Sequence, residues 1–579
     1  MSFLPSLPRI GRPGFLLAGL FLLALVLRLW AIDFGLPYDL TADEPHHIVQ
    51  ALKIGAGEGG PLVRMWHTVG KSGLDTILFA EYALLFAFWW VTGRVDTPED
   101  FALQYLVDPS AFYLAGRVTV AVLGASTCLL VFAAGRRMYG PRVGLGAAAL
   151  AAVSYYHAAA SHIINVHVPM TFALAASLAA FVAYEDTRRR RWLLLAGALS
   201  GAAIALAYTA AIGPLIVLAA LLSAPGRPRS GAVRDAALFG TATLVLVAVM
   251  SPDLLTQSGQ LLHNFVASAP ASAGLSDPED PPAELRGAID SVTFLRAPEG
   301  LAYLAILIKR YNVALTAAVI AAIAIGVWRR ERWTLILAGA VALAVAILSL
   351  SSRGASELYL FSSLPAMWLL AGRAAAAGRT AAAVAVVLAI AAIPFTFTIR
   401  DNVMLAQPDT RLVAKAWIEA HVPSGSKILM DGMRFRFLQS PPLNPDRETA
   451  ARRLADLASS ELELPRDLLP LYQVAAERIP EPRYNLHSTM YGLDVRELDY
   501  YVDGGFDYIV VSSLHQKRYV TEEAIQRYPV SARFYRDLET DRRFRAVYHI
   551  EAVPWQRNGP TLTVYKVARE ATAAEGEAL

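Results

Sequence analysis

The sequence predicts an α-helical polytopic membrane protein with a C-terminal α/β domain outside the cytoplasm. Hydrophobic residues make up 55% of the 579-residue chain and charged residues only 17%, whereas soluble proteins carry about 25% charged residues. Long apolar runs recur through the first 400 residues, and arginines cluster on alternate connections between them. After about residue 401 the pattern changes to an amphipathic helix and short β-rich runs.

Eleven apolar segments are long enough to cross a bilayer, which takes roughly 20 apolar residues, or slightly fewer where polar ends snorkel. They are 14–32, 115–135, 143–160, 170–186, 192–209, 211–224, 236–252, 312–328, 333–350, 359–372 and 380–398. We expect the first to be retained as a span, because Arg28 and Trp30 stand where a signal peptide would carry a small-residue cleavage site.

A twelfth apolar segment, 75–92, decides the topology. If it does not cross the membrane, every arginine-rich connection lies on one side, as the positive-inside rule requires. If it does cross, the run Arg188 to Arg191 falls outside. We therefore expect 75–92 to be an interfacial helix in the first outer loop, anchored by Trp89 and Trp90, with the N-terminus of the chain cytoplasmic.

This topology divides the chain into a transmembrane domain, residues 1–400, and a soluble α/β domain, residues 401–579. The outer loops of the first domain are 33–113, 161–169, 253–311 and 351–358. In the second domain, DTRLVAKAWIEAHV has the apolar spacing of a helix, and KILMD, FDYIVVSS, FRAVYHI and TLTVYKV are typical of strands.

Several function classes are disfavoured by what the sequence lacks. Its single cysteine, Cys128, excludes disulfides within the chain and thiolate metal clusters. No basic run with interleaved aromatic residues points to nucleic acid. The sequence contains no Walker A loop, HExxH motif or GxSxG elbow, which argues against an ATP-driven pump and a serine hydrolase.

The candidate site centres on DLTADEPHH, residues 39–47, directly after the first span. Asp43 and Glu44 begin a predicted helix, with Thr41 as its N-cap and Pro45 in its first turn. The helix dipole favours ionised carboxylates there, and an ionised Asp43 can act as a general base. The alternative is a simple capping cluster with exposed acids.

Histidines and cations supply further candidates for substrate binding. Seven of the eleven histidines lie at outer loops or outer helix ends, where they can bind phosphate, move protons or ligate a divalent metal. Cations on the outer side suit a lipid-linked phosphate, although each one can equally be a snorkelling side chain and each histidine an ordinary interfacial one. The candidates are His46, His47, His67, Lys71, Arg117, His162, Asn165, His167, Lys309, Arg310, Arg353, Glu357 and Tyr359.

Four stretches resemble the GT-C glycosyltransferases of the protein-mannosyltransferase and lipid A aminoarabinose-transferase type, glycosyltransferase family 39. They are LPYDLTADEPHH after the first span, Ala115-Gly116-Arg117-Val118, His167-Val168-Pro169-Met170-Thr171, and QPDTRLVAKAWIEAHVPSGSKIL at 407–429. The chain departs from the family pattern at His167, where the family has aspartate, at Trp66 to Lys71, where it has a tyrosine-proline tract, and at Glu357-Leu358-Tyr359.

The resemblance implies an inverting transfer of a sugar from a polyprenyl-phosphate donor to a lipid, glycan or protein acceptor at the outer face of the cytoplasmic membrane. Asp43 would deprotonate the acceptor, Glu44 or a histidine would orient it, and Arg117, Lys309, Arg310 or Arg353 would hold the donor phosphate. No cofactor is required by this scheme, and a divalent metal is possible. Two other hypotheses stay open: a transporter or flippase of lipid-linked intermediates, and a non-catalytic scaffold whose outer domain binds a glycan or a partner.

Overall fold

The computed structural model describes most of the chain. The described residues are 12–38, 40–41, 44–55, 72–226, 228–251, 253–256, 299–309, 311–349, 356–430, 440–459, 469–487, 496–517, 519–520, 522–527 and 529–568. Five predicted site residues lie outside these ranges: Asp43, His67, Lys71, Arg310 and Arg353. Most of the predicted outer loop 253–311 also lies outside them.

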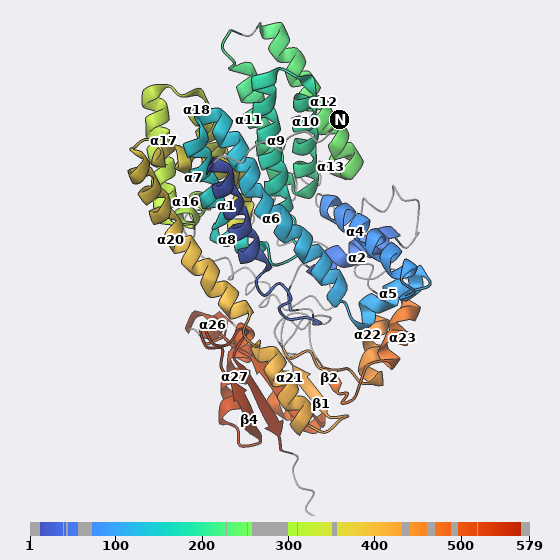
Figure 1. Ribbon diagram of the computed structural model, residues 1–579. Coiled ribbons are helices and arrows are strands. Elements are labelled where there is room, and N and C mark those ends of the chain that lie inside the picture. Colours follow the sequence, from blue (N-terminus) through green and yellow to red (C-terminus); the bar gives the residue numbers. More distant parts are fainter. Residues whose placement is uncertain are drawn as a thin grey trace, which may run out of the picture.

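A bundle of apolar helices forms the larger part of the molecule (Figure 1). Its long members are α1 (Arg12–Leu29), α6 (Ser110–Tyr139), α9 (His167–Thr187), α10 (Arg190–Leu206), α12 (Arg229–Met250), α17 (Val313–Arg329), α18 (Arg332–Ser349) and α20 (Thr380–Leu405). Shorter members are α7 (Pro141–Ala152), α8 (Tyr155–Ala160), η1 (Tyr208–Ala211), α11 (Ile212–Leu222), α13 (Asp253–Thr256), α16 (Glu299–Lys309), η2 (Glu357–Ser363) and α19 (Leu364–Ala375).

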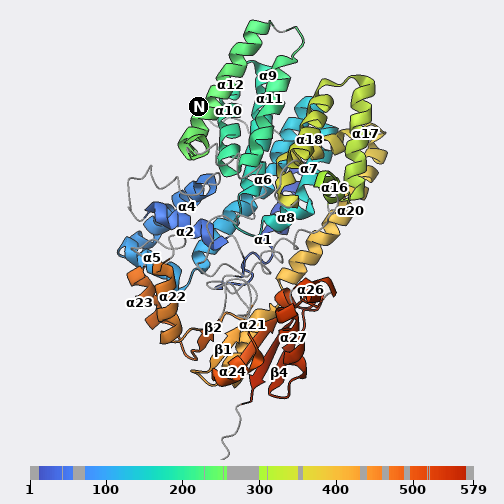
Figure 2. The ribbon, with the colours of Figure 1, turned by 180° about the vertical axis from the view of Figure 1, so that it is seen from behind.

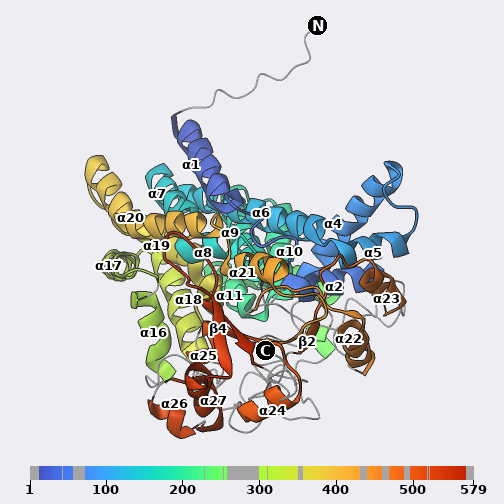
Figure 3. The ribbon, with the colours of Figure 1, turned by 90° about the horizontal axis from the view of Figure 1, so that it is seen from below.

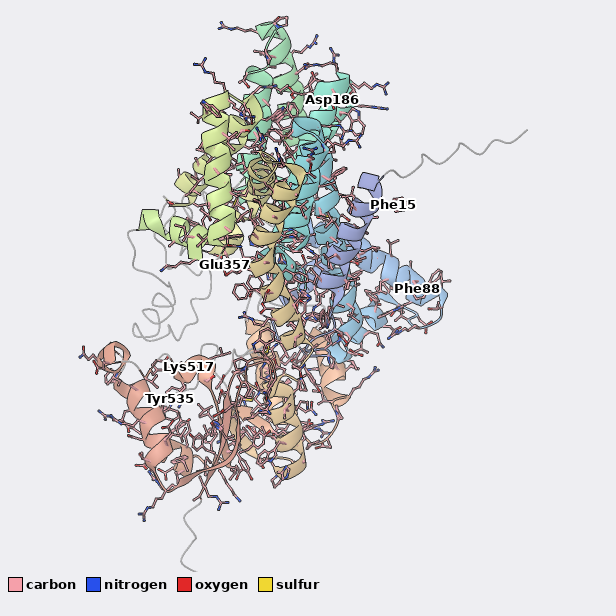
Figure 4. The ribbon with its side chains drawn as sticks, turned by 60° about the vertical axis from the view of Figure 1, so that its left-hand side comes forward. Phe15, Phe88, Asp186, Glu357, Lys517 and Tyr535 are labelled. Atoms are coloured by element: carbon pink, nitrogen blue, oxygen red, sulfur yellow. The ribbon has the colours of Figure 1, made fainter. Side chains whose placement is uncertain are left out.

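Six described helices are long and apolar enough to cross a membrane, and three shorter apolar helices accompany them. The membrane class expected from composition is therefore supported, while the count of eleven crossings stays a prediction. The six include Gly73–Val91, which we expect to be interfacial. Helix α4 (Ser72–Val91) projects sideways from the bundle, across the direction of its long helices, and carries Phe88 outward (Figures 3 and 4). This direction favours the interfacial interpretation.

The predicted span 143–160 is two helices, α7 and α8, with a break at Val153 and Ser154. The reason is a buried cation at the break. Arg28 of α1 donates to the carbonyl oxygens of Ala152 (2.9 Å) and Ala151 (3.2 Å), the last residues of α7. These carbonyls have no partner within α7, and the negative end of the helix dipole favours a positive charge beside them.

The helices of the first outer loop lie at the end of the bundle that faces the C-terminal domain. They are α2 (Glu44–Gly55), α4 and α5 (Pro98–Val107). Thr97 caps α5 in a reciprocal capping box with Asp100. Helix α5 contacts α23 (Leu469–Glu477), which lies beside α22 (Arg447–Ser459) in Figures 1 and 2.

The C-terminal domain is built on a five-stranded sheet of order β2-β1-β3-β5-β4. Its strands are β1 (Lys427–Met430), β2 (Asn485–His487), β3 (Tyr508–Ser512), β4 (Phe544–Ile550) and β5 (Leu562–Val567). Strand β1 runs parallel to β2 and β3, and β5 runs antiparallel to β3 and β4. The four strands predicted from the sequence are present, and β2, only three residues long, was not predicted.

Helices cover this sheet and connect it to the bundle. They are α21 (Thr410–His421), α22, α23, α24 (Leu498–Asp503), α25 (Ser513–Gln516), α26 (Glu522–Arg527) and α27 (Pro529–Thr540). Helix α20 runs from the bundle directly toward the domain (Figure 4) and continues five residues past position 400 before it ends at Leu405. The helix therefore passes through the predicted domain boundary, which stays a prediction.

Candidate active site

Glu44 and Arg117 form a fully buried ion pair at the end of the bundle that faces the C-terminal domain. The guanidinium donates from Nε to Glu44 Oε1 (2.8 Å) and from Nη2 to Oε2 (2.7 Å), a bidentate geometry. Both side chains are 1% exposed or less. Arg117 Nη1 also donates to the carbonyl oxygens of Ile32 (2.9 Å) and Phe34 (3.0 Å). The pair thus ties α6, the segment after α1, and the start of α2 together.

Two further donors complete the shell around the Glu44 carboxylate. The hydroxyl of Thr41 donates to Oε2 at 2.6 Å, and the backbone N–H of Ile164 donates to Oε1 at 2.9 Å. Ile164 can come this close because residue 116 is glycine, where a Cβ would lie 2.7 Å from the Ile164 side chain. Glu44 therefore also anchors the turn 161–166, predicted to be an outer loop, to α2.

Asn165 holds that outer turn in shape. Its Nδ2 donates to the carbonyl oxygens of Ala160 (2.5 Å) and Ile163 (2.9 Å), and its Oδ1 accepts from the backbone N–H groups of His167 (2.9 Å) and Val168 (3.2 Å). The last two are free donors at the beginning of α9, so Asn165 caps this helix with its side chain. The predicted residue is thus found to organise the turn that carries His162 and His167.

His162 is buried between two carbonyl groups. Its Nδ1 and Nε2 lie 3.0 Å from the oxygen of Ala158 and 3.2 Å from that of Trp30. Burial lowers the pKa of His162 below its ordinary value. The ring is therefore neutral at pH 7 and can donate to one carbonyl at a time, which joins the turn to the end of α1.

His167 opens α9 and packs edge-on against two rings of η2, Tyr359 at 6.3 Å and Phe361 at 5.9 Å between centroids. The hydroxyl of Tyr311 donates to the backbone oxygen of Glu357 at 2.6 Å. The predicted residues His167, at the start of α9, and Glu357 and Tyr359, in η2, therefore lie close together in the structure. This group is linked to the Glu44 and Arg117 pair through the turn 161–166.

His46 and His47, the two adjacent histidines of α2, contact each other edge-on with ring centroids 5.6 Å apart. His47 lies on the buried face of α2 and its Nδ1 is 2.7 Å from Asp75 Oδ1 of α4, with both side chains about 5% exposed. Asp75 was not predicted as a site residue. Its only signal is a carboxylate at the start of an apolar helix, where the helix dipole stabilises it.

Lys309, the last residue of α16, lines a cavity of about 200 Å³ in the bundle. The other walls come from α8, α17, α19 and α20, and are largely aromatic or aliphatic, with Tyr155, Tyr156, Tyr311, Trp368 and Phe397 among them. Arg117 and Lys309 are the predicted cations that the structure describes, and Lys309 is the one that borders a mainly apolar cavity. A lipid chain and a charged head group would meet at such a position.

Arg28 and His157 are a buried polar pair that the sequence did not reveal. Arg28 Nη2 lies 3.0 Å from His157 Nδ1, and both residues are 0% exposed. The His157 ring packs edge-on against Trp368 at 5.4 Å. The pair caps the break between α7 and α8, close to Tyr155 and the Lys309 cavity. An arginine near the end of an apolar helix was its only sequence signal.

Within the described ranges, no three histidine, cysteine, aspartate or glutamate side chains are arranged to hold a metal ion. Asp43 and His67 lie outside those ranges, so the predicted site is only partly described. Of the fifteen predicted residues, ten are described. Glu44, Arg117, His162, Asn165, His167, Glu357 and Tyr359 form one connected region. His46 and His47 lie on the adjoining α2, and Lys309 borders the cavity at the end of α16.

Residues 112–255 match the family model of dolichyl-phosphate-mannose-protein mannosyltransferases. The resemblance to the GT-C glycosyltransferases is thereby confirmed. The matched stretch begins just before Arg117 and includes the outer turn 161–166. The matched stretch therefore contains Arg117, but not Glu44, and all of the turn 161–166 that Glu44 binds.

Two solved structures match this chain at low sequence identity and with TM-scores below 0.5. The Archaeoglobus fulgidus oligosaccharyltransferase, in complex with Zn and sulfate, is 14% identical over 94% of this chain and 72% of its own, with a TM-score of 0.49. ArnT from Cupriavidus metallidurans, bound to undecaprenyl phosphate, is 14% identical over 96% and 98%, with a TM-score of 0.46. No curated protein sequence matches the chain.

Proposed function

We propose that this protein is an inverting glycosyltransferase that moves a sugar from a polyprenyl-phosphate donor to an acceptor at the outer face of the cytoplasmic membrane. The observation that carries the proposal is the buried Glu44 and Arg117 pair, which anchors the residue next to Asp43 to a stretch that matches the mannosyltransferase family model. The family description, dolichyl-phosphate-mannose, names a donor of this lipid-linked class.

Asp43 is the general base of the proposed reaction. It removes the proton of an acceptor hydroxyl while the acceptor oxygen bonds to the anomeric carbon of the donor sugar. The bond between that carbon and the phosphate oxygen breaks, and polyprenyl phosphate leaves with the electron pair. The donor is already activated as a phosphodiester, so neither a nucleotide nor ATP takes part.

Glu44 and Arg117 are positioning residues in this proposal. Arg117 is 1% exposed and donates to four described acceptors within the protein. Its guanidinium is therefore occupied in the interior and is not the group that binds the donor phosphate. The Glu44 carboxylate has four donors of its own, which leaves it little capacity to take a proton from an acceptor. Lys309, with Arg310 and Arg353, is then the proposed binding group for the donor phosphate.

The test is the Asp43→Asn variant of the full-length protein in proteoliposomes. The assay supplies polyprenyl-phosphate monosaccharides as donors and a cell-envelope extract as the acceptor source, and measures released polyprenyl phosphate. Removing a general base lowers turnover by about 10²–10⁴-fold, and we expect that loss here with an unchanged melting temperature. Asp96→Asn, the same change at an exposed position of the same loop, is expected to keep wild-type turnover.

Near wild-type turnover by Asp43→Asn would refute Asp43 as the base. If the wild-type protein releases no polyprenyl phosphate from any donor in the panel, the glycosyltransferase proposal fails as a whole. In that event the transporter and the scaffold hypotheses take precedence, and flipping of a fluorescent polyprenyl phosphate across the vesicle membrane separates them.

A further inference from the structure

A cavity of about 550 Å³ lies between the outer end of the bundle and the C-terminal domain. One wall is formed by Phe34, Tyr155 and His162 of the bundle and its outer segments. Helix α20 forms a second wall, and the loop between β4 and β5 of the C-terminal domain forms the third. Figure 4 shows α20 joining the two parts of the molecule at this level. The volume falls within the range of about 300–1,000 Å³ for small-molecule sites.

Polar groups held in fixed positions line this cavity. Asp401 of α20 accepts from the Tyr155 hydroxyl at 2.6 Å and from Arg400 at 3.1 Å. Arg400 donates to Oδ1 from Nε as well, at 3.2 Å, whereas Oδ2 accepts from Tyr155 and keeps a second lone pair. Asp401 therefore retains acceptor capacity at Oδ2 while its orientation is set. Arg557 and Asn558, from the loop between β4 and β5, face the same space. Carboxylate, guanidinium and amide groups together can both donate to and accept from neighbouring hydroxyls.

Trp555 supplies a large aromatic surface at the same cavity. It lies in the tip of the loop between β4 and β5, where Gln556 and Arg557 both donate to the carbonyl of Val553. Its φ of 70° is in the left-handed region, which is a rare conformation for a bulky residue and costs of order 1–3 kcal/mol. Despite this cost, half of the residue's surface is exposed. Neither packing nor backbone preference accounts for a tryptophan here.

We propose that this cavity binds a carbohydrate portion of the acceptor, with Trp555 as the platform for a sugar ring. This inference rests on the proposed function and names the acceptor class for the same site. Sugar rings present C–H faces that pack on aromatic rings and hydroxyls that need both donors and acceptors, which is the combination on these walls. A largely apolar acceptor would leave the remaining hydrogen-bonding capacity of Asp401, Arg557 and Asn558 unused.

The cavity adjoins both halves of the proposed reaction. Phe34 lines it and also lies under Arg117, with the guanidinium carbon 4.3 Å from the ring centre. The acceptor cavity therefore borders the Glu44 and Arg117 pair, whose glutamate directly follows Asp43 in the chain. Tyr155 lines this cavity and the Lys309 cavity alike. A sugar acceptor on one side of Tyr155 and a lipid-linked donor on the other would meet at the outer end of the bundle.

The test uses the full-length protein in nanodiscs and three probes: methyl α-D-mannopyranoside, methyl β-D-galactopyranoside and methyl N-acetyl-β-D-glucosaminide. Saturation-transfer NMR measures the binding of each one. We expect at least one glycoside to bind and Trp555→Gly to bind it at least tenfold more weakly. Glycine adopts positive φ without cost, so Trp555→Gly is expected to melt at or above the wild-type temperature. Trp555→Phe keeps a ring and is expected to retain binding.

Trp328→Ala removes an equally large, exposed side chain far from the cavity and is expected to bind like the wild type. Unchanged binding by Trp555→Gly, or the absence of glycoside binding to a wild-type protein that still releases polyprenyl phosphate, would overturn the acceptor assignment. Loss of turnover alone would concern only the proposed function, so the two failures are distinguishable.

Discussion

Glu44 illustrates how a buried charge is made tolerable by its neighbours. Removing two charges from water costs several kcal/mol each, and this cost is recovered only with good geometry and further hydrogen bonds. The Glu44 carboxylate has a bidentate arginine, a backbone N–H and a hydroxyl around it, all within 2.9 Å. The main effect of the pair is to fix the positions of the residues that flank Glu44, and its net contribution to stability is secondary.

We predict that Glu44→Gln destabilises the protein strongly, because it leaves the Arg117 charge buried without a counter-charge. The expected cost is about 3–5 kcal/mol. The matched control is Asp186→Asn, which breaks the exposed ion pair with Arg137, where the side chains are 53% and 41% exposed. That change is expected to cost under about 1 kcal/mol. The measurement is the melting temperature of each purified variant.

A double variant tests the cause. Glu44→Gln combined with Arg117→Met removes both charges, and it is expected to be less destabilised than the sum of the two single changes, since no unpaired charge remains. Equal melting temperatures for Glu44→Gln and Asp186→Asn would show that the buried pair is not the anchor inferred from its geometry.

At the scale of elements, small residues let the bundle helices approach closely. Helix α10 carries a GxxxG pattern, Gly197 and Gly201, on the face toward α12. A Cβ at these positions would lie 2.5 Å from the carbonyl oxygen of Phe239 and 2.4 Å from that of Thr243. Lipid chains are as apolar as leucine, so helices in a membrane associate through close packing of this kind and not through apolar burial alone.

We predict that Gly201→Ala separates α10 from α12 and destabilises the bundle by about 1–3 kcal/mol, the usual cost of overpacking. Gly240→Ala on α12 is the control, because no atom lies within 4 Å of its Cβ position. That variant is expected to be neutral or more stable by up to about 1 kcal/mol, since alanine favours helix over glycine. Thermal unfolding of both variants checks this, and similar melting temperatures would contradict the packing argument.

For the whole molecule, the arginine-rich connections gather at the end of the bundle opposite the C-terminal domain. Ion pairs join several of them, including Arg332 with Glu185 (3.1 Å) and Arg373 with Glu331 (2.5 Å). Figure 4 places Asp186 near that end and Glu357 nearer to the C-terminal domain. One membrane orientation satisfies the positive-inside rule at all of these connections. We therefore predict that the candidate site and the C-terminal domain lie outside.

The single native cysteine allows this orientation to be tested directly. In a Cys128→Ala background, Ser424→Cys introduces an exposed thiol in the C-terminal domain, and Ser230→Cys introduces one at the start of α12. A membrane-impermeant maleimide added to intact cells, with the outer membrane opened where one exists, is expected to label position 424. Position 230 is expected to react only after the inner membrane is made permeable. The reverse pattern would place the candidate site in the cytoplasm.

The sequence alone determined the class of protein and the local character of its segments. Apolar length identified the helices, β-branched runs identified four of the five strands, and the adjacent Asp43 and Glu44 marked the candidate site. These features depend on residues close together in the chain, so periodicity and composition report them. The break in the predicted span 143–160 could not be predicted from local sequence, because Arg28, which stabilises it, is more than 120 residues away in the chain.

The tertiary structure decided which residues meet. Arg117, expected to hold a phosphate, is enclosed with Glu44 from 73 residues earlier in the chain. Asp75 pairs with His47, and Trp555 of the C-terminal domain lines the same cavity as Tyr155 of the bundle. Apolar helix faces resemble one another, so the hydrophobic pattern of a sequence does not determine which helices pack together. Close packing at glycines and the need to pair each buried charge select them, and both requirements exist only in three dimensions.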